Sequence, residues 1–156
     1  MNALYARRAS TFDDFLPALE RAHASARLVI PNTGCQLAAS LLALELDRAG
    51  LPAEYVCGHY SAAPEQKHWW VQVNSVLLDP SRDQFDDEDP LSESYGGEYS
   101  RSCSKPASEM EHEATMHLQL HWSFNRRARP AIKAVVTLYG LDLAKVEEPM
   151  GPLSAP

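Results

Sequence analysis

One cysteine, one histidine and one aspartate have the residue types and the chain order of a nucleophilic catalytic triad. Cys35 stands directly after Gly34 at the expected start of a helix, His68 opens the apolar run HWWVQV, and Asp79 closes the run VLLD. The unpaired N–H groups in the first turn of a helix favour a thiolate. An adjacent imidazole can take up the thiol proton, and a carboxylate can hold that imidazole in the productive tautomer. We therefore predict that Cys35 is a nucleophile, that His68 is its base and later acid, and that Asp79 orients the ring.

The spacing between His68 and Asp79 predicts a β-hairpin that brings their side chains together. If Asn74 and Ser75 form a two-residue turn, Trp70 lies opposite Asp79 on the neighbouring strand. His68 and Asp79 are then diagonal neighbours on one face of the hairpin, about 7–8 Å apart at the backbone. A shift of one residue in the turn would send the two side chains to opposite faces. The predicted register is therefore the one that the triad needs.

Two further residues are candidates for binding the substrate. The backbone N–H of Cys35 can stabilise a developing oxyanion, and Gln36 is a candidate second donor beside the polar groups of the Asn32-Thr33 turn. Trp70 shares the face of His68, so we expect it to shield the site or to line the acyl pocket.

Hydrophobic periodicity and breaker residues define the elements that must hold these side chains. The pattern of residues 11–26 predicts a first helix that starts near Asp13 or Asp14, which places Pro17 in its first turn. It also predicts a second helix that begins at Cys35 and is capped by Asn32 or Thr33. A capping-box sequence at 108–111 predicts a third helix that runs to about Arg129. Strands are expected at 53–60, 68–73 and 76–79. The segment 131–140 is expected to be a helix, although its β-branched residues also suit a strand. A long irregular segment over 83–106 could cover the site. The chain is expected to form one domain over 1–146 with a disordered tail over 147–156.

Composition narrows the class of protein. The chain has 14 basic and 21 acidic residues and a net charge of -7, which argues against a nucleic-acid partner. No run reaches the ~18 apolar residues of a membrane span, and the N-terminus lacks the apolar run of a secretory signal. Three cysteines without such a signal predict no disulfide framework and a cytoplasmic location, with Cys57 buried in its strand and Cys103 incidental.

The stretch from residue 34 to residue 85 resembles the core of the transglutaminase-like superfamily, which is related to papain-like cysteine proteases by circular permutation. The matching positions are Cys35, Gly50, Gly58, His68 with Trp70 and Val71, and Asp79-Pro80-Ser81. The resemblance implies an α+β fold in which the cysteine-bearing helix packs on an antiparallel sheet. It also implies thiol attack on an amide or ester through a thioester acyl-enzyme, with hydrolysis, deamidation or acyl transfer as outcomes. The substrate would be a peptide or protein, or an acyl-carrying small molecule, and no cofactor or metal would be needed. Trp69 departs from the family pattern, which often has a small residue there.

Two other functions remain as alternatives. The run HEATMHLQLH holds His112, Glu113, His117 and His121, which suggests a zinc hydrolase. In a regular helix, however, His112 and His117 point about 140° apart, so only His117 and His121 share a face. The second alternative is an inactive family member that binds a partner through the acidic loop at 83–89, whose carboxylates would favour basic peptides.

Overall fold

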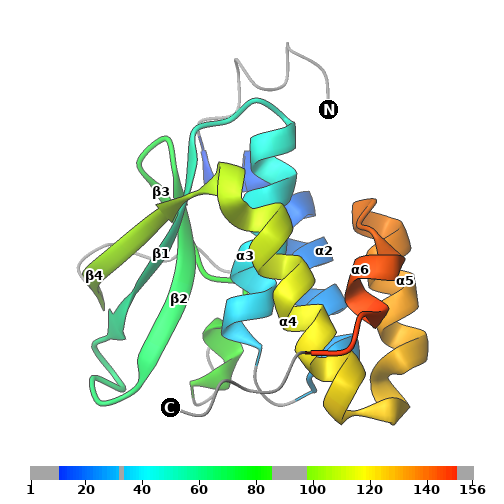
Figure 1. Ribbon diagram of the computed structural model, residues 1–156. Coiled ribbons are helices and arrows are strands. Elements are labelled where there is room, and N and C mark those ends of the chain that lie inside the picture. Colours follow the sequence, from blue (N-terminus) through cyan, green and yellow to red (C-terminus); the bar gives the residue numbers. More distant parts are fainter. Residues whose placement is uncertain (1–10, 32–33, 86–97, 151–156) are drawn as a thin grey trace.

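Helices form one layer of the molecule and an antiparallel sheet forms the other (Figure 1). The computed structural model describes residues 11–31, 34–85 and 98–150. Within these residues the sheet has four strands in the order β3-β2-β1-β4. The strands are β1 (Ala53–Tyr60), β2 (Lys67–Val73), β3 (Val76–Leu78) and β4 (Tyr99–Pro106). The α+β class is therefore confirmed.

The helix that begins with Cys35 lies at the centre of the fold. This helix, α3 (Cys35–Arg48), contacts α2, α4 and the two middle strands of the sheet. Its apolar side chains from Leu37 to Leu46 are buried on nearly every side, as expected for a helix enclosed by other elements. The surrounding helices are α2 (Phe12–Val29), α4 (Met110–Phe124), α5 (Arg129–Tyr139) and α6 (Leu143–Glu147). Close packing around α3 fixes where its first residue, Cys35, is presented.

The hairpin between β2 and β3 has the predicted register. Val71 pairs with Leu78, Gln72 with Leu77 and Val73 with Val76, which leaves Asn74 and Ser75 as a two-residue turn. Both turn residues have positive φ, 48° and 67°, as a type I′ turn requires. The strand predicted at 53–60 and the helix start at Cys35 are also confirmed.

Several predicted helix boundaries differ from those of the structure. Thr11 N–H bonds to the Asp14 carboxylate at 3.0 Å and starts α2 at Phe12, so Pro17 lies inside the helix and not in its first turn. The helix predicted over 108–129 ends at Phe124, and no side chain caps its start. A short 3-10 turn follows, and Pro130 falls in the first turn of α5, where its missing N–H costs little. The helix predicted at 131–140 is thus present and starts two residues early.

The segment predicted to be irregular over 83–106 is only partly so. Residues 82–84 form a 3-10 turn, and residues 99–106 pair with β1 as the edge strand β4. The serine, arginine and lysine residues of β4 predicted a loop, but exposed polar and charged side chains are usual on an edge strand, where they prevent pairing with other chains. Half of the predicted flap, residues 86–97, lies outside the described residues, as do Asn32 and Thr33 and the last part of the predicted tail. The start of that tail, Glu147, belongs to helix α6.

Cys57 and Cys103 form a disulfide between β1 and β4, which corrects the expectation of no disulfide. Pairing of the two strands places their Cα atoms 5.2 Å apart, within the usual range for a disulfide. The cysteine count alone could not reveal a pair made adjacent by strands 46 residues apart. A disulfide does not favour the predicted cytoplasmic location, because that compartment keeps thiols reduced. Among the described residues no helix is long and apolar enough to cross a bilayer.

Reduction of this disulfide is expected to lower the free energy of unfolding by about 3–4 kcal/mol, because it closes a loop of 46 residues in the unfolded chain. Urea unfolding of the Cys35→Ser variant, with and without dithiothreitol, measures the effect without interference from the free thiol. Cys57→Ser/Cys103→Ser in the same background should match the reduced protein. Equal unfolding midpoints in the two conditions would contradict the prediction.

Candidate active site

His68 and Asp79 form a buried hydrogen-bonded pair. His68 Nε2 lies 2.7 Å from Asp79 Oδ2, and the two residues are 0% and 1% exposed. The other carboxylate oxygen, Oδ1, accepts the backbone N–H of Ser81 at 3.1 Å. Both residues stand at matching ends of the β2–β3 hairpin, so the register of its turn sets their approach. The carboxylate is thus anchored on one oxygen and binds the imidazole with the other.

Two residues that the sequence did not single out complete this network. Tyr99, the first residue of β4, donates its hydroxyl to Asp79 Oδ2 at 2.7 Å. The side-chain amide nitrogen of Gln84 lies 3.0 Å from His68 Nδ1. Gln84 follows Asp79 closely in the chain and could have been noticed as a polar neighbour. Tyr99 gave no such signal, because only the pairing of β4 with β1 brings it to the site.

Aromatic rings enclose the imidazole of His68. The ring centroids of Phe85, Trp70 and Tyr99 lie 4.8, 6.2 and 6.4 Å from that of His68. Trp70 is 1% exposed, so it shields His68 and its indole does not reach solvent. Gly58 allows this packing, because a Cβ there would lie 2.7 Å from Trp70 Cη2 and 2.0 Å from the Ser100 carbonyl oxygen. The glycine is therefore needed for close approach of β1 to β4 and to the indole.

Cys35 is the free cysteine of the chain and is partly exposed at the first position of α3. It interacts with the His68 ring, whose pKa reflects opposing effects. Burial lowers the pKa of His68, but hydrogen bonds and negative charge from Asp79 and from Cys35 outweigh it and raise the pKa to about 9. An imidazole with this pKa is protonated at neutral pH and can stabilise a thiolate beside it. The structure therefore brings Cys35, His68 and Asp79 together in one site.

A pocket of about 180 Å³ opens beside Cys35. Trp69 lines this pocket, whereas the predicted Trp70 does not. Gln36 lines it as well and also lines a neighbouring pocket of about 220 Å³ that reaches the Cys57–Cys103 disulfide. The predicted nucleophile and the predicted oxyanion donor are thus accessible from one cavity.

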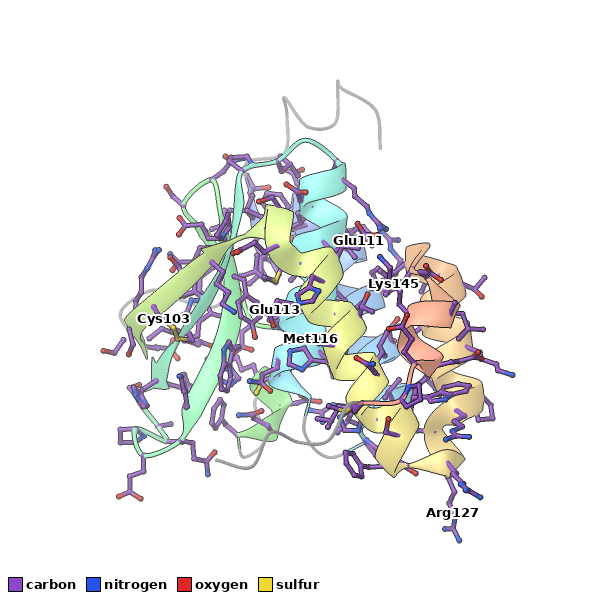
Figure 2. The ribbon with its side chains drawn as sticks, viewed as in Figure 1. Cys103, Glu111, Glu113, Met116, Arg127 and Lys145 are labelled. Carbon is purple, nitrogen blue, oxygen red and sulfur yellow. A yellow bond between two sulfur atoms is a disulfide. The ribbon has the colours of Figure 1, made fainter. Side chains whose placement is uncertain are left out.

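The histidines of α4 do not form a metal site. Among the described residues no group of three or more His, Cys, Asp or Glu side chains is arranged to hold a metal ion. Glu113 forms an ion pair with Lys105, and His112 lines a different pocket, together with Glu111 and Lys145. Figure 2 shows Glu111 and Glu113 on α4, Lys145 on α6 and Cys103 on the edge strand. The geometry of these side chains gives the zinc alternative no support.

Asp83 is the described member of the acidic run at 83–89. It forms an ion pair with Arg27, and its carboxylate lies 3.6 Å from Nε2 of His23; both partners are on α2. It therefore ties the segment after Asp79 to the helical layer, and its carboxylate is already engaged. Residues 86–89 of the run lie outside the described residues.

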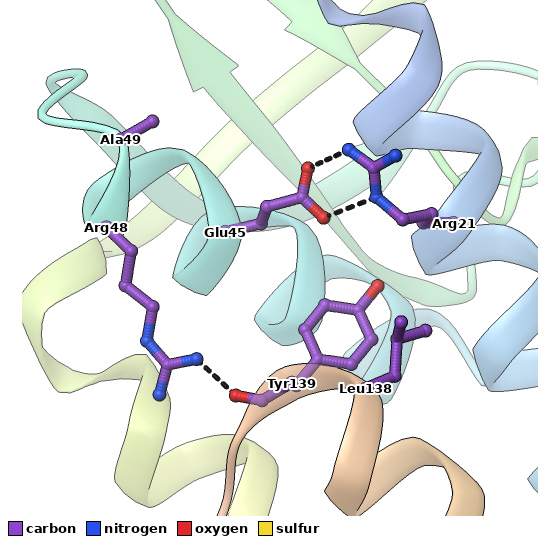
Figure 3. A pocket seen from close by; sticks show the side chains of 6 residues that line it. All are labelled: Arg21, Glu45, Arg48, Ala49, Leu138 and Tyr139. Atoms are coloured by element: carbon purple, nitrogen blue, oxygen red, sulfur yellow. Dashed lines mark hydrogen bonds and ion pairs between the residues drawn. The ribbon is translucent and has the colours of Figure 1, made fainter. Parts of the chain in front are cut away.

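Another surface pocket, of about 220 Å³, is lined by residues that form ion pairs and hydrogen bonds between helices and include no thiol or histidine (Figure 3). Arg21 and Glu45 form a two-point ion pair across it, and Arg48 donates to the backbone carbonyl of Tyr139. These contacts join α2, α3 and α5 and leave no nucleophile among the six residues that line the pocket. We assign it a structural role.

No protein-family model, curated protein sequence or solved structure matches this chain.

Proposed function

We propose that this protein is a cysteine-dependent acyl-transfer enzyme, a hydrolase or acyltransferase of the transglutaminase-like type. The observation that carries the proposal is the buried His68–Asp79 pair, whose imidazole interacts with a free, partly exposed thiol at a helix start. A buried ion-pairing network of this kind is costly to maintain for structure alone, and a histidine with a strongly shifted pKa beside a thiol that lines a pocket is typical of catalytic sites.

The proposed reaction has two steps that share one intermediate. The Cys35 sulfur attacks the acyl carbon, an S–C bond forms, and the bond to the leaving group breaks as the His68 imidazolium gives that group a proton. Water or an amine then attacks the thioester while His68 takes a proton back, which releases the acyl product and restores the thiolate. Asp79 keeps the proton of Nε2 in place through both steps, so that Nδ1 serves as the exchanging nitrogen.

The start of α3 supplies donors for the oxyanion in this mechanism. The first N–H groups of a helix have no intrahelical partner, and those at Cys35 and Gln36 lie beside the nucleophile. The Gln36 side chain is exposed and lines the same pocket, so it can add a further hydrogen bond. Substrates of this site would be peptides or proteins, or small molecules that carry an acyl group.

Iodoacetamide labelling of the native oxidised protein tests the state of the thiol. We expect one label per chain, on Cys35, at a rate at pH 6.5 at least tenfold above that of N-acetylcysteine. The reason is that an ordinary cysteine, with a pKa near ~8.5, is about 1% thiolate at that pH, whereas a thiolate beside imidazolium reacts directly. Mass spectrometry of the labelled peptides gives both the site and the rate.

The matched variants are His68→Gln and His59→Gln. His59 lies on β1 and its Nδ1 contacts the backbone carbonyl of Gln66, away from the triad. His68→Gln should reduce the labelling rate to that of the free amino acid, and His59→Gln should leave it unchanged. A slow rate in the unmodified protein, equal to that of His68→Gln, would favour an inactive binding protein instead.

A further inference from the structure

Apart from Cys35, whose proposed thiolate is paired with the His68 imidazolium, the side chains that line the pocket beside Cys35 are uncharged. They include Ile30, Trp69, His117, Leu120 and His121. Burial lowers the pKa of His117 more than nearby Glu113 raises it, and burial also lowers the pKa of His121. Both rings are therefore neutral at pH 7. An ammonium group in the pocket would lose water and find no carboxylate among these side chains, and a carboxylate would in addition face the thiolate proposed for Cys35.

The size of the pocket suits one side chain. Its volume is about 180 Å³, and a cavity of about 150 Å³ is large enough for benzene. A branched aliphatic or aromatic group would fill the space against Ile30, Trp69 and Leu120, whereas a longer piece of substrate would have to lie outside it.

His117 provides one polar atom in this apolar setting. Its Nε2 is buried and has no hydrogen-bond partner among the described residues. The nearest carboxylate oxygen, Oε2 of Glu113, is 3.6 Å away, too far for a hydrogen bond. A buried ring nitrogen without a partner is uncommon and calls for a functional reason. A rotation of the ring, which already lines the pocket, would bring this nitrogen to the pocket surface and let a polar atom of a bound substrate satisfy it.

Apolar surface continues from the pocket along α4. Leu120 lies in the pocket and is 38% exposed, and Met116 and Phe124 precede and follow it by one helical turn, with exposures of 40% and 68%. Residues four apart lie on one face of a helix, so these side chains form a stripe that starts at the pocket. Figure 2 shows Met116 on α4.

We propose that this pocket binds the side chain of the acyl-donor residue, that it selects an aliphatic or aromatic group, and that His117 hydrogen-bonds to the bound substrate. The inference rests on the proposed function, because Cys35 must react with the acyl group that the pocket positions. It adds the substrate class: acyl donors with an uncharged apolar side chain at the reacting residue.

Acylation of Cys35 by a matched set of thioesters tests the selectivity. The probes are the N-acetyl leucine, phenylalanine, aspartate and lysine thioesters of one common thiol, and mass spectrometry follows the acylated protein. We expect the leucine and phenylalanine probes to react at least tenfold faster than the aspartate and lysine probes. Leu120→Asp should remove most of this preference. Phe124→Asp makes the same change on the same helix outside the pocket and should keep it.

A second pair of variants tests the role of His117. His117→Phe keeps the ring volume and removes the nitrogen, so acylation by the leucine probe should slow roughly tenfold through a weaker binding step. The iodoacetamide rate of Cys35 should not change, since the thiol and His68 are untouched. His112→Phe, at a residue that lines another pocket, is the control. An unchanged acylation rate in His117→Phe would overturn the assignment of this residue.

Binding without chemistry separates the inference from the proposed function. In Cys35→Ala, N-acetyl-phenylalaninamide should shift the NMR signals of the His117 and His121 rings, and the lysine analogue should not. If N-acetyl-phenylalaninamide shifts these ring signals while no probe acylates the unmodified protein, the proposed function fails and the assignment of an apolar pocket stands. If all four probes acylate Cys35 at equal rates, the selectivity is overturned and the function stands. If the amide leaves both rings unshifted and no probe reacts, both proposals fall.

Discussion

The Cys35→Ala variant will form no acyl-enzyme with any thioester probe, and its turnover will fall by a factor of about 10⁴ or more. Removal of the nucleophile from a triad leaves only what binding and oxyanion stabilisation provide. No other side chain can replace the sulfur, because the other two cysteines form the Cys57–Cys103 disulfide. Intact mass spectrometry after mixing with the leucine thioester, together with steady-state release of the thiol, measures both effects.

Loss of fold is a poor explanation for this result, because Cys35 is partly exposed at the first position of its helix. Alanine is also well tolerated at a helix position, so the thermal midpoint should change little. Cys35→Ser serves as the companion variant, since it keeps the shape of the side chain and loses the reactive thiolate. Acylation of either variant at the rate of the unmodified protein would show that Cys35 is not the nucleophile.

Asp79→Asn is expected to reduce turnover by about 10²–10⁴-fold while Cys35 remains in place. Two carboxylate oxygens of Asp79 serve three donors: the ring of His68, the hydroxyl of Tyr99 and the N–H of Ser81. An asparagine has one oxygen, so one of these donors would face an NH₂ group, and the favoured histidine tautomer would be lost. Measurement of kcat and KM for the leucine thioester should place the loss mainly in kcat.

The pKa of His68 provides an independent measurement on the same variant. In the unmodified protein it is raised to about 9, with Asp79 among the groups that raise it. Without that carboxylate only Cys35 still opposes the effect of burial, so the pKa should fall below 9 in an NMR titration of the ring. Asp83→Asn is the matched control, because Asp83 lies nearby but binds Arg27 instead of the imidazole. An unchanged His68 titration in Asp79→Asn would remove the orienting role from Asp79.

The His68–Asp79 pair should also make the free energy of unfolding depend on pH. His68 binds its proton more tightly in the folded state than at its ordinary value of 6.5, so its contribution is fully present below pH ~6.5. That contribution, on the order of 3 kcal/mol, is lost as the pH rises through about 9. Urea unfolding of the unmodified protein between pH 6 and pH 10 should show this loss, and Asp79→Asn should show a smaller one, because only the contribution of Cys35 then raises the pKa of His68.

The sequence by itself determined the local parts of the candidate site. Alternation of side chains and a two-residue Asn-Ser turn determine which strand residues share a face, so the contact between His68 and Asp79 could be predicted. The start of α3 at Cys35 followed from the breakers before it and the leucines after it. These features depend on neighbours within a few residues or on one hairpin.

Only the tertiary structure decided which residues from distant parts of the chain reach the candidate site. Tyr99 and Cys103 enter because β4 adds to the sheet beside β1, and edge strands with polar side chains give no hydrophobic pattern to predict this. His117 and Leu120 meet Cys35 because α4 packs on α3, a contact that depends on the shapes of two helix faces. Periodicity shows which face of a helix is buried, but not against which partner, and this is why the pocket could not be predicted.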